Sequence, residues 1–84
     1  GDISAKISRA TRNHSDIRRG SSIRGAIDLA KILKLVSSLS VETVSEMAIM
    51  ALATKIELED GVDRPIEAIV QEIVEAICQE LVSL

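Results

Sequence analysis

The stretch Pro65-Ile-Glu-Ala-Ile-Val-Gln-Glu-Ile-Val-Glu-Ala-Ile-Cys-Gln-Glu-Leu81 has the most regular apolar pattern in this 84-residue sequence. Its apolar residues recur at steps of three and four, which places them on one face of an α-helix. They are Ile66, Ile69, Val70, Ile73, Val74, Ile77 and Leu81. Pro65 has no N–H to lose and suits the start of such a helix. The pattern spans fewer than three heptads, so it predicts a bundle helix rather than a coiled coil.

Three further helices are predicted upstream, at about Ile3–Asn13, Ile23–Ser38 and Val41–Ile56. The second is apolar most of the way round, which is typical of a helix at the centre of a bundle. Ser40 is a good N-cap for the third. No stretch has the strict alternation of a β-strand, so no strand is predicted. The expected fold is all-α, a small four-helix bundle that forms one domain over residues 1–84.

The amino-acid composition limits which residue types can fill the core and which cellular compartment is expected. The sequence is 46% apolar but holds no Phe, Tyr or Trp, so Ile, Leu, Val, Ala and Met must fill the core. No apolar run approaches the roughly 20 residues of a membrane span. The single cysteine cannot form an internal disulfide, and a cytoplasmic setting is therefore expected. Because the chain begins with Gly1 and not with Met, it is expected to be a fragment of a larger protein.

Charge is distributed unevenly along the chain. Residues 1–34 hold eight Lys or Arg and three Asp, whereas residues 35–84 hold two basic and ten acidic residues. The basic half can face an anion or an acidic partner, or the two halves can neutralise each other within one fold. The sequence leaves both explanations open.

Most catalytic signatures are absent. The sequence has no Gly-x-x-x-x-Gly-Lys-Ser/Thr loop for nucleotide phosphates. His14 and Cys78 are its single histidine and cysteine, too few for a zinc site of about four ligands. His14 continues the spacing of the first helix, which favours packing at the helix end over catalysis. Cys78 lies at the edge of the last apolar stripe and is expected to be a partly buried structural thiol. The chain alone is therefore predicted not to be an enzyme.

The most informative segment is Arg18-Arg-Gly-Ser-Ser-Ile-Arg24, where arginines flank a turn that leads into a helix. The first turn of a helix exposes unpaired N–H groups and a partial positive charge. Arg24 is disfavoured there by the helix dipole. It either recognises an anion, since guanidinium matches phosphate geometry, or it is a surface residue paired with Asp16 or Asp28.

At this segment the chain resembles the helical lid of AAA+ ATPases of the MoxR and magnesium-chelatase type. Residues 11–17 resemble that family's Thr-Arg-x-His-Pro, and residues 20–26 resemble its Gly-Ala-Ser-Pro-Arg-Ala. Residues 39–44 are similar to Val-Thr-Pro-Glu-Asp-Val, and residues 53–56 to the end of the family's third helix. Ser15 and Ile23 stand where the family has proline, and Gly25 stands where it has alanine, which costs roughly 1 kcal/mol of helix propensity.

The resemblance implies a lid that covers ATP bound by a preceding α/β domain of the same chain. Arg24 would be the sensor-2 arginine on the ATP phosphates, with Gly20 and Ser22 completing the motif, while the other domain would hold the magnesium. The lone chain would bind no cofactor tightly. Such ATPases form homo-oligomeric rings and act in a chaperone-like way on client proteins.

Two other classes of function are compatible with the residues. A free-standing interaction module could dock the acidic helix at residues 66–81 in a partner's groove. A nucleic-acid binder could use the basic first half, but the sequence pI is about 5.0 and no aromatic residue can stack on bases. Nucleic acid is therefore not an expected partner.

Overall fold

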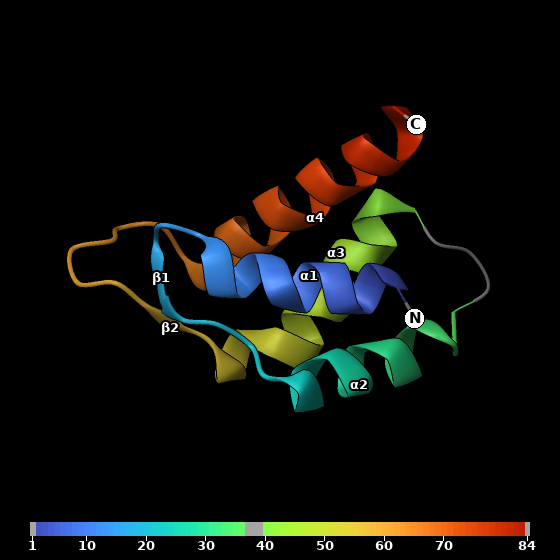
Figure 1. Ribbon diagram of the computed structural model, residues 1–84, viewed down its shortest axis with the longest axis horizontal. Helices are drawn as coiled ribbons and strands as arrows, with labels where there is room; N and C mark the ends of the chain where they lie inside the picture. The colour runs from blue at the N-terminus through green and yellow to red at the C-terminus, as the bar shows by residue number, and fades with distance from the viewer. Residues whose placement is uncertain (1, 37–39, 84) are drawn as a thin grey trace.

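Four α-helices and a short two-stranded sheet form the described parts of the chain, residues 2–36 and 40–83, in the computed structural model (Figure 1). In chain order they are α1 (Asp2–Asn13), β1 (Ile17–Arg19), α2 (Ile23–Leu33), α3 (Val41–Leu52), the 3-10 turn η1 (Ala53–Lys55), β2 (Glu57–Leu58) and α4 (Ile66–Ser83). The prediction of four helices is confirmed, and the four are in contact with one another. The domain is mostly helical, as predicted, and the short two-stranded sheet is an addition that the prediction lacked.

The two strands tie the chain after α1 to the chain after α3. They pair antiparallel, with Ile17 opposite Leu58 and Arg19 opposite Glu57. The Glu59 N–H extends the ladder by donating to the Asp16 carbonyl at 2.9 Å. Ile17 is buried, and so the sheet carries one side chain into the core. Strands of three and two residues are too short to produce a period-two pattern in the sequence.

The apolar face of α4 forms the largest part of the core, as its periodicity predicted. Its buried residues are Ile69, Val70, Ile73, Val74 and Ile77. The side chain of Leu81 lies outside the described part of the structure. The Pro65 carbonyl accepts from the N–H groups of Ala68 and Ile69, which places Pro65 at the entrance of the helix. Because α4 uses this face against α1 and α3, the face is not free to dock elsewhere.

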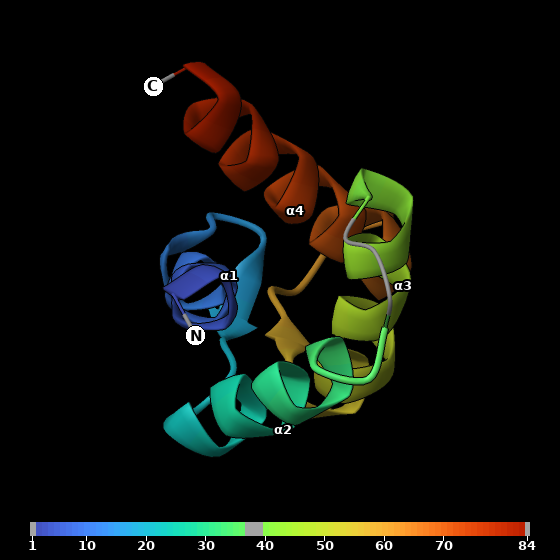
Figure 2. The same ribbon diagram turned by 90° about the vertical axis from the view of Figure 1, so that its right-hand side faces the viewer.

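The helix α2 is shorter and more peripheral than predicted. It ends at Leu33, not near Ser38, and residues 37–39 lie outside the described part of the chain. Only Gly25, Leu29 and Leu33 are buried on it, while its outer face is open to solvent. Figure 2 shows α2 and α4 on opposite sides of the domain, with α1 and α3 between them. The expectation of a central α2 is therefore wrong.

The helix α3 begins as predicted and ends earlier. The Ser40 side chain accepts from the Thr43 N–H at 3.1 Å and caps the helix. The regular helix ends at Leu52, and one 3-10 turn follows instead of a continuation to Ile56. Its apolar stripe enters the core, with Val44, Ala48, Ala51 and Leu52 buried and Met47 packed at the edge.

Two buried serines give a test of what holds the helices together. The Ser8 hydroxyl lies 3.3 Å from the Ser21 carbonyl and 3.2 Å from the Ser22 carbonyl, whereas the Ser45 hydroxyl has no hydrogen-bond partner among the described residues. Ser8→Ala should lower the free energy of unfolding by about 1 kcal/mol. Ser45→Ala should leave it unchanged or raise it by up to about 1 kcal/mol, because an unsatisfied buried hydroxyl is removed. Urea unfolding of both variants measures the difference, and equal losses would contradict the assignment.

Candidate functional site

The entrance to α2 is held against α1 by a buried polar network. The Ser21 N–H donates to Thr11 Oγ1 at 2.8 Å, and Arg12 Nη1 donates to the Ser21 carbonyl at 2.9 Å. Thr11, Ser8 and Ser21 are each almost fully buried. Paired buried polar groups fix a segment strongly, since breaking one leaves an unsatisfied partner. The backbone that leads into α2 is thus positioned by α1.

The two glycines of this entrance are required by close packing. A Cβ atom on Gly20 would lie 2.5 Å from Arg12 N and 2.6 Å from the Thr11 carbonyl carbon, so the loop touches the α1 backbone directly. A Cβ atom on Gly25 would meet Ser21 Oγ and would lie 2.9 Å from Leu52 Cδ2. These contacts give a reason for glycine at both positions, and at Gly25 they explain why glycine stands in a helix despite its low helix propensity. The described glycine with positive φ is Gly61.

The first turn of α2 lacks the features that usually neutralise it. Ser22 occupies the N-cap position but makes no side-chain cap hydrogen bond, and the turn contains no acidic residue. Arg24 is exposed, and it makes no ion pair or hydrogen bond within residues 2–36 and 40–83. The predicted partners are used elsewhere, because Asp16 pairs with Arg64 and Asp28 with Lys55.

Arg24 still contributes to the field around Asp28. The hydrogen bond from Lys55 is the main cause that lowers the pKa of the Asp28 carboxyl. Burial is the second-largest effect and raises that pKa, while the charges of Lys55, Arg24 and Lys31, in that order, lower it further. A cation at position 24 is therefore partly balanced through space, without a direct contact.

The outer face of α2 combines exposed apolar and basic side chains. Ile23 is 73% exposed and Ile27 is 44% exposed, one turn apart on the face away from the core. Exposed Lys31 and Lys34 lie farther along the same face, since residues three, four and seven apart share one side of a helix. Ile23 and Ile27 thus form a small exposed apolar patch beside cations that pair with no described carboxylate.

The two charged halves of the chain neutralise each other mainly around the β-sheet. Arg18 pairs with Glu59 and Asp60, and Arg19 lies 3.8 Å from Glu57. Arg64 joins Asp16 and Glu72. Among the described residues, five basic side chains pair with no carboxylate: Lys6 and Arg9 of α1, Arg24 and Lys31 of α2, and Lys34 at the C-cap of α2. Neutralisation thus accounts for part of the basic half and leaves these positions free.

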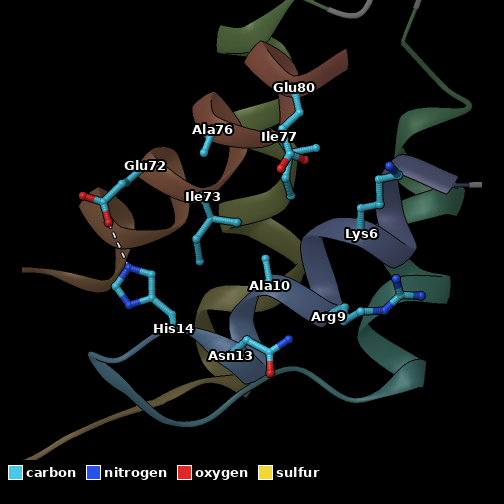
Figure 3. A pocket seen from close by; sticks show the side chains of 10 residues that line it. All are labelled: Lys6, Arg9, Ala10, Asn13, His14, Glu72, Ile73, Ala76, Ile77 and Glu80. Carbon is cyan, nitrogen blue, oxygen red and sulfur yellow. Dashed lines mark hydrogen bonds and ion pairs between the residues drawn. The ribbon is translucent and has the colours of Figure 1, made fainter. Parts of the chain in front are cut away.

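A second feature, which the sequence reasoning missed, is a groove of about 520 Å³ between α1 and α4 (Figure 3). His14 closes one end of it, where its Nε2 lies 2.8 Å from Glu72 Oε1 and its Nδ1 accepts from the Asp16 N–H at 3.0 Å. The hydrogen bond from His14, followed by that from Arg64, lowers the pKa of the Glu72 carboxyl. The expected packing of His14 at the helix end is confirmed, since its side chain is 18% exposed.

Cys78 is not part of a metal-binding or catalytic cluster among the described residues. Cys78 is a free, partly buried thiol packed at the edge of the core, as predicted. In the described parts of the chain, no group of three His, Cys, Asp or Glu residues could hold a metal ion. The described helices also include none long and apolar enough to cross a membrane.

Comparison with protein-family models, with curated proteins and with solved structures finds no match to this chain.

Proposed function

We propose that this domain is the nucleotide-sensing lid of an AAA+ ATPase of the MoxR and magnesium-chelatase type. In this proposal Arg24 contacts the ATP phosphates as the sensor-2 arginine, and Gly20 and Ser22 shape the turn before it. The ATP and its magnesium are held by a preceding α/β domain of the same chain. The parent protein forms a homo-oligomeric ring and remodels client proteins in a chaperone-like way.

The observation that carries the proposal is the unpaired guanidinium of Arg24 in the uncapped first turn of α2. Both the helix dipole and the free first-turn N–H groups favour an anion at this position. An arginine beside them adds a planar donor set that fits phosphate oxygens. The exposed Ile23 and Ile27 flank this turn, and they supply apolar surface for the proposed neighbouring domain.

Lid motion follows from a difference in affinity. A lid whose arginine contacts the γ-phosphate binds the ATP state more tightly than the ADP state, and only such a difference can shift a conformational equilibrium. The rigid attachment of the α2 entrance to α1 through Ser21 and Thr11 would carry the movement of Arg24 to the whole domain.

The proposal is tested on the complete gene product that contains these 84 residues. ATP turnover should fall to background when residues 1–84 are deleted, because the lid completes the nucleotide site. The product should also contain a Gly-x-x-x-x-Gly-Lys-Ser/Thr loop upstream of Gly1. A product without such a loop, or one that hydrolyses ATP equally well without these residues, would exclude the lid assignment.

A further inference from the structure

His14 is hydrogen-bonded at both ring nitrogens, and the two contacts fix its protonation state. Its Nδ1 lies 3.0 Å from the backbone nitrogen of Asp16, and its Nε2 lies 2.8 Å from Glu72 Oε1, the contact drawn in Figure 3. A backbone N–H can only donate, so Nδ1 is the acceptor and carries no hydrogen. A carboxylate can only accept, so Nε2 carries the hydrogen. The geometry therefore requires a neutral imidazole with its hydrogen on Nε2.

The Asp16 N–H belongs to the turn that joins α1 to β1. The Ile17 N–H donates to the His14 carbonyl at 3.1 Å and closes this turn. The His14 ring stabilises the same turn by accepting from the Asp16 N–H. The Asp16 carbonyl accepts in turn from the Glu59 N–H at the end of the β-sheet. The ring thus joins the turn and the adjoining end of the sheet to α4.

Arg64 makes a second link between the same segments. Its guanidinium lies 3.0 Å from Glu72 Oε2 and 3.4 Å from Asp16 Oδ2. Arginine stays protonated in proteins. The hydrogen bond from His14, followed by that from Arg64, holds the pKa of the Glu72 carboxyl below its ordinary value. Arg64 and Glu72 therefore keep their charges between about pH 5 and 8, the range in which histidine side chains gain and lose a proton.

Charged groups face the ring from every segment packed around it. They are Asp16 in the turn, Arg64 in the loop before α4, Lys6 and Arg9 on α1, and Glu72 and Glu80 on α4. The carboxylates favour a second proton on the ring, and the cations oppose it. Of these six groups, Glu72 is the one whose side chain is bonded to a ring nitrogen. The charge nearest to the ring therefore favours protonation.

A second proton on the ring would act on one of its two contacts. An imidazolium donates at both nitrogens, so Nδ1–H would oppose the Asp16 N–H and that N–H would lose its acceptor. The contact between Nε2 and Glu72 would instead gain the attraction of opposite charges. Protonation would therefore release the turn and leave α1 joined to α4.

We infer that His14 is a proton-operated switch between the turn after α1 and the helix α4. In the neutral ring both links are made. In the protonated ring the link to Glu72 remains and the Asp16 N–H is released, which loosens the turn and the end of the β-sheet. The switch goes beyond the lid function and does not depend on it, because all of its groups lie within the 84-residue chain.

The experiment follows the 84-residue chain by nuclear magnetic resonance from about pH 8 to about pH 5. The ring ¹⁵N shifts should show hydrogen on Nε2 and none on Nδ1 at the upper pH. As the ring takes up its second proton, the Asp16 amide signal should move with the same midpoint. Its hydrogen exchange, corrected for the effect of pH on exchange itself, should accelerate roughly fivefold, as expected for one lost hydrogen bond. The Thr43 amide, which donates to the Ser40 side chain in α3, is the internal control and should not change.

Two substitutions separate the roles of the two ring nitrogens. His14→Asn has no titrating group, and an asparagine side chain accepts from the N–H two residues ahead. The Asp16 amide should therefore stay bonded at both ends of the pH range. His14→Gln can donate to Glu72 but replaces the titrating ring and its Nδ1 acceptor, so the Asp16 amide should be released at both ends. Circular dichroism checks that each variant stays folded.

Three results would overturn the proposal. One is a neutral ring that carries its hydrogen on Nδ1. Another is an Asp16 amide signal that does not follow the titration of the ring. The third is an Asp16 amide that still depends on pH in His14→Asn as it does in the wild type, because the change would then belong to a carboxyl group and not to the histidine.

Discussion

Replacing Gly20 by alanine is expected to lower the free energy of unfolding by about 3 kcal/mol, the upper part of the usual range for overpacking. The added Cβ would lie 2.5–2.6 Å from three backbone atoms of Thr11 and Arg12. Backbone within a helix cannot move aside as a flexible side chain can, so the turn must shift and break the Ser21 hydrogen bonds. In a domain of this size the melting temperature should fall on the order of 10–20 °C, measured by thermal unfolding followed by circular dichroism.

Gly61→Asn is the matched control for Gly20→Ala. Gly61 has φ +85° and has nothing within 4 Å of its added Cβ. Asparagine tolerates that backbone region better than other residues, so the variant should lose no more than about 1 kcal/mol. If Gly20→Ala is as stable as the wild type while Gly61→Asn is not, the turn is not packed against α1 as described.

The features that were predicted correctly from the sequence are those with local causes. The stripe of α4 and the Ser40 cap of α3 depend on residues within a few turns of each other. The length and position of α2 depend on tertiary contacts, and its apolar composition led to a wrong prediction of both. Its apolar residues on most sides suggested a central position, but only the face with Leu29 and Leu33 meets α1 and α3.

The contacts that could not be predicted join residues far apart in the sequence. Arg64 pairs with Asp16, and His14 contacts Glu72 from 58 residues away. The β-sheet is a similar case, since its strands lie about forty residues apart and are too short to show a pattern.

The candidate site was predicted in part. The sequence identified Arg24 at a helix entrance and left open whether it meets an anion or an internal carboxylate. Asp16 and Asp28 are the carboxylates in question, and each is hydrogen-bonded to another cation. Neither carboxylate is therefore the hydrogen-bond partner of Arg24 that the second explanation required. The close approach of Gly20 to Arg12 was not predicted, because it depends on the tertiary fold and not on local conformation.

Arg24→Ala is expected to affect the proposed ATPase strongly and the isolated domain hardly at all. Its side chain is exposed and has no ion pair in the described part of the chain, so the stability of the 84-residue chain should stay within about 0.5 kcal/mol. In the complete gene product the change would remove a charged hydrogen bond to phosphate. Such bonds contribute about 1.5–3 kcal/mol, which corresponds to roughly ten- to a hundredfold in ATP turnover.

Lys31→Ala separates the proposed phosphate contact from a general effect of charge on α2. Lys31 is exposed, carries the same charge and lies two turns farther from the helix entrance, where an attraction to bound phosphate is weaker. Its replacement should reduce turnover less than Arg24→Ala does, and Arg24→Lys should fall between them because it keeps the charge and loses the planar donor pair. If Arg24→Ala unfolds the isolated chain while turnover per folded molecule is unchanged, Arg24 is a structural residue and the nucleotide contact does not exist.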